Sequence, residues 1–314
     1  MRFGKTPRRA LLRERGATVR QDSDENLSSV VGSRHRWVEI AVAVMHEKRA
    51  VAGLTILLAF VLMGSFAPFI SPYDPFRLLG KPYLQPSSQH ILGTDSLGRD
   101  VFSQIIWGAR VSLFVGGAVA LSVATIGVTV GLLSATSHPI VDEILMRLCD
   151  ILIIIPKLPL TIFVAAVLGR GIWNIIAVLA AFGWPQMARM VRSEALSIKQ
   201  RPYVDAARMS GAGQLRITFQ IILPNLLPLV IANAILAVIS GVISEASLSF
   251  LGLGDPSQMS WGTVIYFSMI GGAIYNGGWA WVAAPGFCIS LIGLGTTFLG
   301  STINVISNPR LRRR

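Results

Sequence analysis

Residues 111–135 read VSLFVGGAVALSVATIGVTVGLLSA and contain no charged side chain. A helix needs about 20 mostly apolar residues to cross the hydrocarbon core of a membrane, and this stretch is long enough. Of the 314 residues in the chain, 52% are hydrophobic and only 14% are charged, with a mean hydropathy of +0.59. Soluble domains usually carry about 25% charged residues. The sequence therefore predicts a helical membrane protein.

Other stretches of the chain have the same apolar character, and together they predict an all-α fold with six transmembrane helices. The expected spans lie within a membrane domain at 50–305 and are 50–70, 111–135, 145–168, 172–188, 224–248 and 279–304. Residues 261–275 are also uncharged and are a candidate seventh span. They are short and rich in glycine and aromatic residues, which favours a re-entrant or interfacial segment.

The distribution of basic residues predicts the topology. Of the 28 Lys and Arg residues, 22 fall in segments that six spans place in the cytoplasm, and 5 fall in segments placed outside. Because cytoplasmic loops carry an excess of Lys and Arg, both termini are expected in the cytoplasm, as in a multi-pass protein of the plasma (inner) membrane. A seventh span would move the basic tail at 306–314 outside. Residues 1–36 are predicted to be a basic, disordered tail. Residues 37–49 are predicted to be an interfacial amphipathic helix or an extension of the first span.

The formal net charge of +12 could also indicate a nucleic-acid-binding protein. That class gathers its basic residues on one face of a soluble domain, whereas here they lie between long apolar segments, so no nucleic-acid partner is expected. The sequence contains no P-loop, GxSxG motif or histidine-rich metal set. We therefore expect no enzyme activity, no metal site and no cofactor in this chain. Cys149 and Cys288 have no CxxC partner and are interpreted as packing residues.

The segment between the fourth and fifth spans has an unusual construction. Residues 193–224 read SEALSIKQRPYVDAARMSGAGQLRITFQIILP. Pro202 suits the first turn of a short helix, and Gly211 and Gly213 end that helix and allow a sharp turn. A second amphipathic stretch then runs to Pro224, where the next span starts. The loop at 192–223 is therefore predicted to form a compact knob of two short helices that fits a groove on a partner.

Three motifs resemble those of a known family. The first resembles the EAA signature of binding-protein-dependent ABC importer permeases, with aspartate in place of the consensus glutamate. It consists of Asp205-Ala206-Ala207, three residues, Gly211, nine residues, and then Ile221-x-Leu223-Pro224. The other two are similar to segments of the C-type subunit of the dipeptide, oligopeptide and nickel transport family. They are HILGTDSLGRDVFSQIIWGARVSLFVGG at 90–117 and SEASLSFLGLGDPSQMSWGTVI at 244–265. The resemblance covers about residues 37–308.

This resemblance implies a type I ABC importer permease fold and a transport function. It implies a homologous permease, two ATP-binding subunits that hold ATP and Mg, and an extracytoplasmic binding protein that delivers di- or oligopeptides or a similar small solute. Membrane lipid is the remaining expected partner. The resemblance also implies that the loop at 192–223 docks an ATPase. The residues that it assigns to this coupling are Asp205, Ala206, Ala207, Gly211, Leu215, Ile221, Leu223 and Pro224.

Polar residues within the fifth span are candidates for a solute path. Ser240, Ser244 and Ser247 are spaced i, i+4 and i+7, so they share one face of a helix, next to Glu245. Such a face either lines a path or mediates ordinary helix packing. Glu245 lies near the outer end of its span and is expected close to the water interface.

Lys157 is an intramembrane charge, and such charges are costly and by default suggest function. It lies between Pro156 and Pro159, where the helix is expected to break, and it is predicted to face the path or a carboxylate. Asp150 is a candidate partner if the helix is distorted.

Two smaller features concern local structure. Gly127 and Gly131 form a GxxxG pair that allows close helix packing. Thr94 or Asp95 can cap the helix that continues into the second span.

Three alternative functions remain open. An ion-coupled secondary transporter could use Lys157, Asp150 and Glu245, but it leaves the docking loop unexplained. A membrane scaffold without transport is another alternative. A nickel or oligosaccharide importer permease shares the motifs, although the expected spans contain no histidine for a nickel site.

Overall fold

A computed structural model describes residues 42–307, and its regular secondary structure is helical, apart from one isolated bridge between Thr94 and Asp100. The expected tail at 1–36, the expected tail at 306–314 from residue 308 on, and most of the expected interfacial helix at 37–49 lie outside the described residues. The elements in chain order are α3 (Lys48–Ser65), α4 (Ala67–Ile70), α5 (Val101–Thr136), α6 (Pro139–Ile154), α7 (Lys157–Leu168), α8 (Ile172–Lys199), α9 (Pro202–Met209), α10 (Gln214–Ile217), the π-helix η1 (Thr218–Ile222), α11 (Leu223–Phe250), α12 (Trp261–Ile270) and α13 (Trp279–Ser307).

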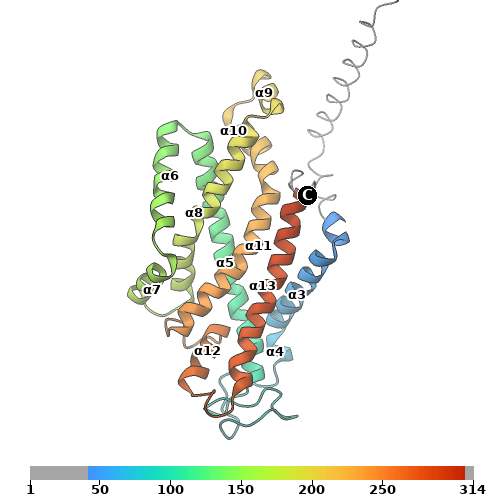
Figure 1. Ribbon diagram of the computed structural model, residues 1–314, viewed down its shortest axis with the longest axis vertical. Coiled ribbons are helices and arrows are strands. Elements are labelled where there is room, and N and C mark those ends of the chain that lie inside the picture. Colours follow the sequence, from blue (N-terminus) through green and yellow to red (C-terminus); the bar gives the residue numbers. More distant parts are fainter. Residues whose placement is uncertain (1–41, 308–314) are drawn as a thin grey trace, which may run out of the picture.

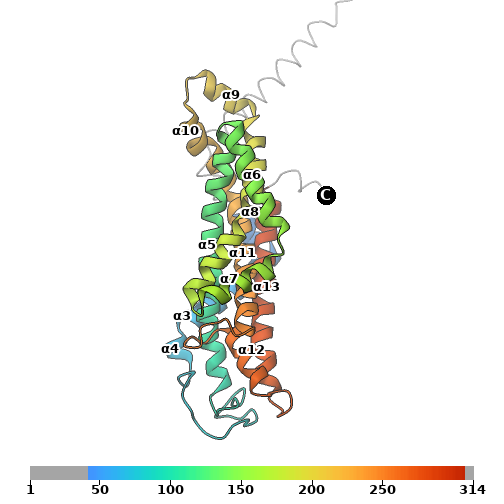
Figure 2. The same cartoon turned by 90° about the vertical axis from the view of Figure 1, so that its left-hand side faces the viewer.

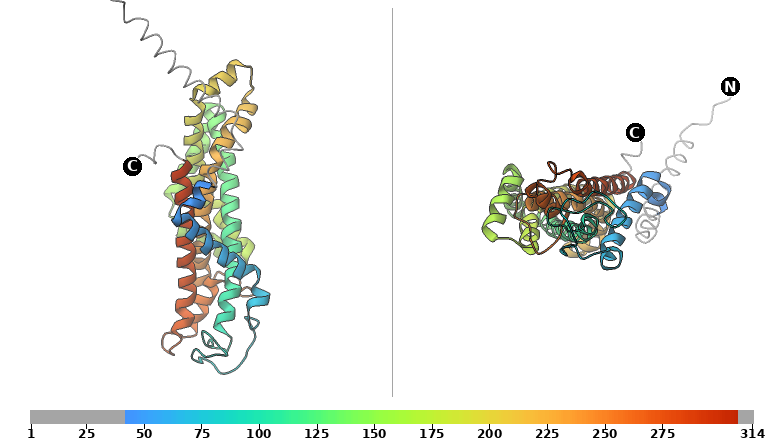
Figure 3. Two further views of the ribbon diagram at one scale, coloured as in Figure 1. Left: turned by 90° about the vertical axis from the view of Figure 1, so that its right-hand side faces the viewer. Right: turned by 90° about the horizontal axis from the view of Figure 1, so that it is seen from below.

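The long helices form an elongated bundle (Figure 1). α5 packs against α8, α11 and α3, and α13 packs against α11 and α3. α9 and α10 lie at one end of the bundle, and the loop at 71–100 lies at the opposite end (Figures 1 and 2). Seen along the bundle, α6 and α7 flank one side and α3 flanks the other (Figure 3).

Within the described residues, four helical segments are long and apolar enough to cross a membrane, or five if the bent pair of α6 and α7 counts as one span. The four are Lys48–Ser65, Val101–Thr136, Gln214–Phe250 and Trp279–Ile306. The remaining expected span, 172–188, lies in α8, which also carries polar and charged residues toward its second half. α12 has 10 residues, or about 15 Å of helix, half of the hydrocarbon thickness.

The expected span at 145–168 is sharply bent. α6 and α7 meet at an angle of 90°. Ile155, the residue before Pro156, is extended, with φ −70° and ψ 127°. A proline disfavours the helical conformation of the residue before it, so the helix stops here and restarts at Lys157. The break expected beside Lys157 is confirmed.

The second short helix of the loop does not end at Pro224. α10 continues through η1 into α11, and Gln214–Phe250 is one uninterrupted helical segment of 37 residues. Pro224 has no N–H to donate and its ring crowds the preceding turn, and the wider π-turn just before it gives that ring room. The second short helix expected in the loop is therefore present as α10, but it is continuous with the span that follows it.

The cap of α5 also differs from the prediction. Asp100, rather than Thr94 or Asp95, caps the helix, and its side chain accepts a hydrogen bond from the Ser103 N–H at 2.7 Å. Asp95 is occupied in the preceding turn, where it binds the Arg99 guanidinium at 2.5 Å.

The contact between α5 and α8 depends on two glycines. A Cβ on Gly127 would lie 2.6 Å from the Met187 Cβ, and a Cβ on Gly131 would lie 2.6 Å from the Ala188 carbonyl oxygen. Only glycine allows the two backbones to come this close. The packing role predicted for the GxxxG pair is confirmed.

Candidate functional site

The turn between α9 and α10 is a Schellman motif. Gly211 has a φ of +82°, a conformation that glycine adopts without strain. Its N–H donates to the Arg208 carbonyl at 2.9 Å, and the Ala212 N–H donates to the Ala207 carbonyl at 3.0 Å. These two bonds satisfy carbonyls that the end of a helix leaves free. Gly213, by contrast, has an ordinary φ of −67°.

The loop presents large apolar side chains to its surroundings. Met209 is 84% exposed, Leu215 is 75% exposed and Phe219 is 59% exposed. Val204 and Ile217, from the same short helices, are buried in the core and anchor the loop to the bundle. Exposed apolar residues on a loop that is anchored in this way are typical of a surface that binds another protein.

The structure divides the predicted coupling residues into two groups. Asp205, Ala206, Gly211 and Leu215 are exposed around the turn, and Ala207 is half-buried beside them. The Asp205 carboxylate forms an exposed ion pair with Arg208 at 3.0 Å. The second group is half-buried where η1 joins α11 and consists of Ile221, Leu223 and Pro224.

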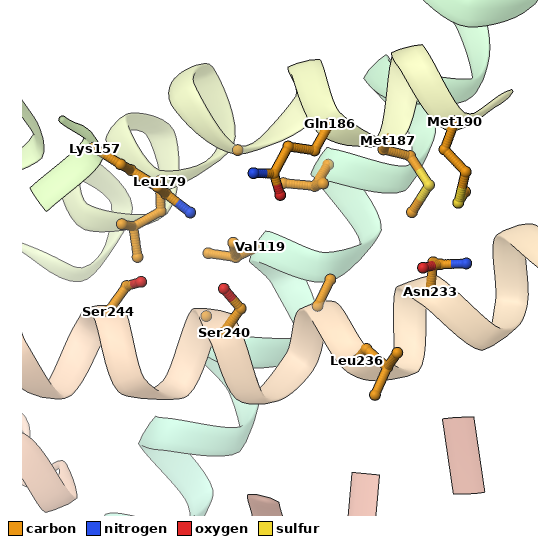
Figure 4. Close-up of a pocket in the computed structure, with 14 residues that line it drawn as sticks. Val119, Lys157, Leu179, Gln186, Met187, Met190, Asn233, Leu236, Ser240 and Ser244 are labelled. Carbon is orange, nitrogen blue, oxygen red and sulfur yellow. The ribbon is translucent and has the colours of Figure 1, made fainter. Parts of the chain in front are cut away.

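A cavity of about 230 Å³ lies between α5, α8 and α11, beside the start of α7. The Lys157 ammonium, the Gln186 amide and the hydroxyls of Ser240 and Ser244 point toward the same space (Figure 4). Asn233 lies farther along α11 in the same cavity. The structure therefore brings together three of the four residues that the sequence suggested for a solute path.

Lys157 has no acidic partner among the described residues. Asp150, the partner considered from the sequence, instead pairs with Arg189 at 2.8 Å. The side chains of Lys157, Gln186, Ser240 and Ser244 form no hydrogen bond or ion pair with any part of the chain from 42 to 307. These four polar groups are available to a molecule that enters the cavity.

Glu245 lies outside this cavity. It is 2% exposed, not at a water interface as expected, because it packs where α5, α11 and α12 meet. Its carboxylate accepts hydrogen bonds from Ser249 and Ser260 at 2.7 Å and from Ser112 at 3.3 Å. Ser247 also turns away from the cavity and donates to the Ile243 carbonyl at 2.8 Å.

Several site residues were not predicted. Asn233 and Ser240 are seven residues apart on one face of α11, so the helical spacing that selected the serines could have found Asn233. Gln186 and Met209 gave no such signal. Their positions depend on how α8 packs and on the direction in which α9 leaves it.

A second cavity lies at the α4 end of the bundle. It measures about 700 Å³ and is lined by aromatic and polar side chains, among them Trp107, Arg110, Phe114, Trp173 and Asp255. The sequence did not indicate it, because its lining comes from three segments far apart in the chain.

Within the described residues, no group of three His, Cys, Asp or Glu side chains could hold a metal ion. Cys149 and Cys288 are both free and buried, which confirms their interpretation as packing residues.

Comparison with known proteins gives two family matches. The model of the family described as "Binding-protein-dependent transport system inner membrane component" matches residues 127–313. The model described as "N-terminal TM domain of oligopeptide transport permease C" matches residues 36–90.

Individual relatives agree with these matches. The oligopeptide transport system permease protein OppC of Bacillus subtilis is 36% identical over 283 residues, which cover 88% of this chain and 90% of the relative. The dipeptide transport system permease protein DppC of the same organism is 38% identical, with 85% and 83% covered. The di/tripeptide transport system permease protein DppC of Pseudomonas aeruginosa is 35% identical, with 85% and 90% covered.

Proposed function

The chain belongs to the family of binding-protein-dependent transport system inner membrane components, and we propose that it is one of two permease subunits in an ATP-driven importer of di- and oligopeptides. It is a multi-pass protein of the inner membrane. Relatives at 35–38% identity are named as oligopeptide, dipeptide and di/tripeptide permeases, which supports peptides as the cargo. The cavity described above has no histidine in its lining, so it offers less to a nickel ion than to an organic solute.

The partners of the proposed complex are a homologous permease, two ATP-binding subunits and an extracytoplasmic binding protein. The ATP-binding subunits hold ATP and Mg, and this chain catalyses no reaction itself. The exposed apolar surface formed by Met209, Leu215 and Phe219 is the observation that carries the proposal, because it offers an ATPase apolar side chains to bind.

The proposed topology has six spans and places both termini in the cytoplasm. The bent pair of α6 and α7 forms the third span, and α8 forms the fourth, so the loop with α9 and α10 is cytoplasmic. The loop at 71–100 and α12 then lie on the outer side, where the binding protein releases its cargo. The excess of Lys and Arg in the segments around α9 supports this orientation.

The connection between loop and cavity suggests how coupling works. α8 enters the loop and contributes Gln186 to the cavity. The continuous helix from Gln214 to Phe250 leaves the loop and contributes Ser240 and Ser244. When the ATPases close and displace α9, both walls of the cavity shift relative to each other. Lys157 and the two serines are the proposed contacts along the solute path.

Co-purification from mild detergent tests this proposal. The tagged wild-type chain is expected to recover a second permease and ATPase subunits, together with ATPase activity. Leu215→Asp should lose the ATPases and keep the second permease, since a carboxylate on the exposed apolar surface opposes docking. Ile91→Asp is the matched control, because Ile91 is 53% exposed at the opposite end of the bundle. Full ATPase recovery by Leu215→Asp, or a wild-type chain that purifies alone, would contradict the assignment.

A further inference from the structure

We propose that Lys157 is a carboxylate-binding residue, and that the importer uses it to favour solutes with a free carboxylate, such as the C-terminus of a peptide. This inference rests on the proposed function, because it concerns the solute that passes the cavity between α8 and α11. The relevant chemistry is the pairing of one ammonium with one carboxylate inside a small polar cavity.

The first argument is the missing counter-charge. An ammonium at membrane depth is costly unless it is paired or lies in a water-filled space. Asp150 is held by Arg189 at 2.8 Å, and Glu245 is held by three serines on another side of α11. Neither carboxylate lines the cavity. Among the described residues, the positive charge of Lys157 is therefore not neutralised by this chain.

The second argument is the set of groups around the ammonium. The hydroxyls of Ser240 and Ser244 and the amide of Gln186 face the same space and have no partner within residues 42–307 (Figure 4). A carboxylate offers two oxygens with about four acceptor positions. One ammonium, two hydroxyls and one amide N–H can fill these positions. The cavity thus contains both the charge and the donors that a carboxylate needs.

The third argument is the location of the cavity. Two of its walls are the helices that enter and leave the loop with α9 and α10, and α5 forms another. Gly183 lies opposite Lys157, and a Cβ there would come within 3.9 Å of the ammonium nitrogen. The ammonium therefore lies against a wall that we expect to move during transport. A carboxylate bound here would be released when α8 and α11 separate.

An acidic residue of the second permease could fill the same role as the solute. The solute is favoured because the three uncharged donors beside Lys157 are also unpaired and surround a volume of about 230 Å³ that no part of the described chain fills. A single carboxylate from a partner would neutralise the charge and leave most of that space unexplained.

The test uses the importer reconstituted with its partner subunits and binding protein. Uptake of trialanine with a free C-terminus is compared with uptake of trialanine amide, for the wild type, Lys157→Met, Lys157→Arg and the control Arg147→Met. The measured quantity is the ratio of acid uptake to amide uptake. Any preference of the binding protein affects all variants equally, so it cancels when their ratios are compared.

The proposal predicts that Lys157→Met lowers the ratio about tenfold, as expected for the loss of one charged hydrogen bond. Lys157→Arg should restore most of the ratio. Arg147→Met should behave as the wild type, because Arg147 forms only an exposed ion pair with Glu143 on α6 and does not line the cavity. An unchanged ratio in Lys157→Met would overturn the proposal. Loss of the second permease from the purified Lys157→Met complex would also overturn it, in favour of an ion pair between subunits. If the wild type took up neither peptide with ATP, the proposed function itself would fail.

Discussion

At the scale of single residues, Glu245 shows how a carboxylate is kept in the apolar part of the bundle. Ser249 on the same helix, Ser260 at the start of α12 and Ser112 on α5 all donate to it. Ser112 also accepts from the Trp261 N–H at 3.1 Å, so the same cluster fixes the first turn of α12. A buried polar group is tolerated only when its hydrogen bonds are made, as they are here.

Glu245→Ala should destabilise the protein strongly. The change leaves three buried hydroxyls without their acceptor, and we expect it to cost roughly 2–4 kcal/mol of folding free energy. Glu143→Ala is the control. Glu143 forms only an exposed ion pair with Arg147, so its loss should cost less than about 0.5 kcal/mol. Thermal unfolding in detergent measures the difference, and equal melting temperatures for the two variants would show that the serine cluster is not stabilising.

Some residues of the site were predictable and others were not. Pro156 and Pro159 marked the break at Lys157, because the effect of a proline on its neighbours is local. The spacing of Ser240 and Ser244 placed them on one face for the same reason. The burial of Glu245 was missed because it depends on α12 folding back against α5 and α11, and no local pattern encodes that contact.

At the scale of helices, the contact between α5 and α8 depends on small residues at fixed positions. Gly127 and Gly131 face α8 at a distance that leaves no room for a side chain. Gly117, in the same helix, has no atom within 4 Å of the position that its Cβ would occupy. Helix packing therefore requires Gly127 and Gly131 in α5, but it does not require Gly117 in the same helix.

Gly131→Ala and Gly117→Ala should have opposite effects. The new methyl group at Gly131 would lie 2.6 Å from the Ala188 carbonyl oxygen, so the helices must separate at a cost of about 1–3 kcal/mol. At Gly117 the methyl group meets open space, and alanine favours the helix by up to ~1 kcal/mol. Thermal unfolding of the two purified variants tests this. If Gly131→Ala is as stable as Gly117→Ala, the close contact does not exist.

Helix bounds were less predictable than helix existence. The apolar runs at 50–70, 224–248 and 279–304 coincide with α3 and α4, α11 and α13. α5, however, starts ten residues before its expected span because Asp100 caps it there. The π-turn at Thr218–Ile222 carries α10 into α11 past Pro224. Both features arise from particular hydrogen bonds that hydropathy does not describe.

At the scale of the whole molecule, the same two helical segments connect the loop to the cavity. α8 and the continuous segment from Gln214 to Phe250 join them without an intervening flexible linker. The Schellman turn at Gly211 fixes how the loop leaves α9. Such an arrangement can transmit a displacement of the loop to the cavity, which is the central claim for this chain.

The most direct test of that claim is uptake of a labelled peptide by vesicles containing the complete importer, with ATP supplied to the cytoplasmic side. Gly211→Leu should abolish uptake while the chain still inserts, because leucine is strained at a φ of +82° and distorts the docking turn. Gly213→Leu should retain most of the uptake, since Gly213 has an ordinary φ of −67° and open space around it. Uptake that proceeds without ATP, collapses with a protonophore and is unaffected by Gly211→Leu would contradict the account.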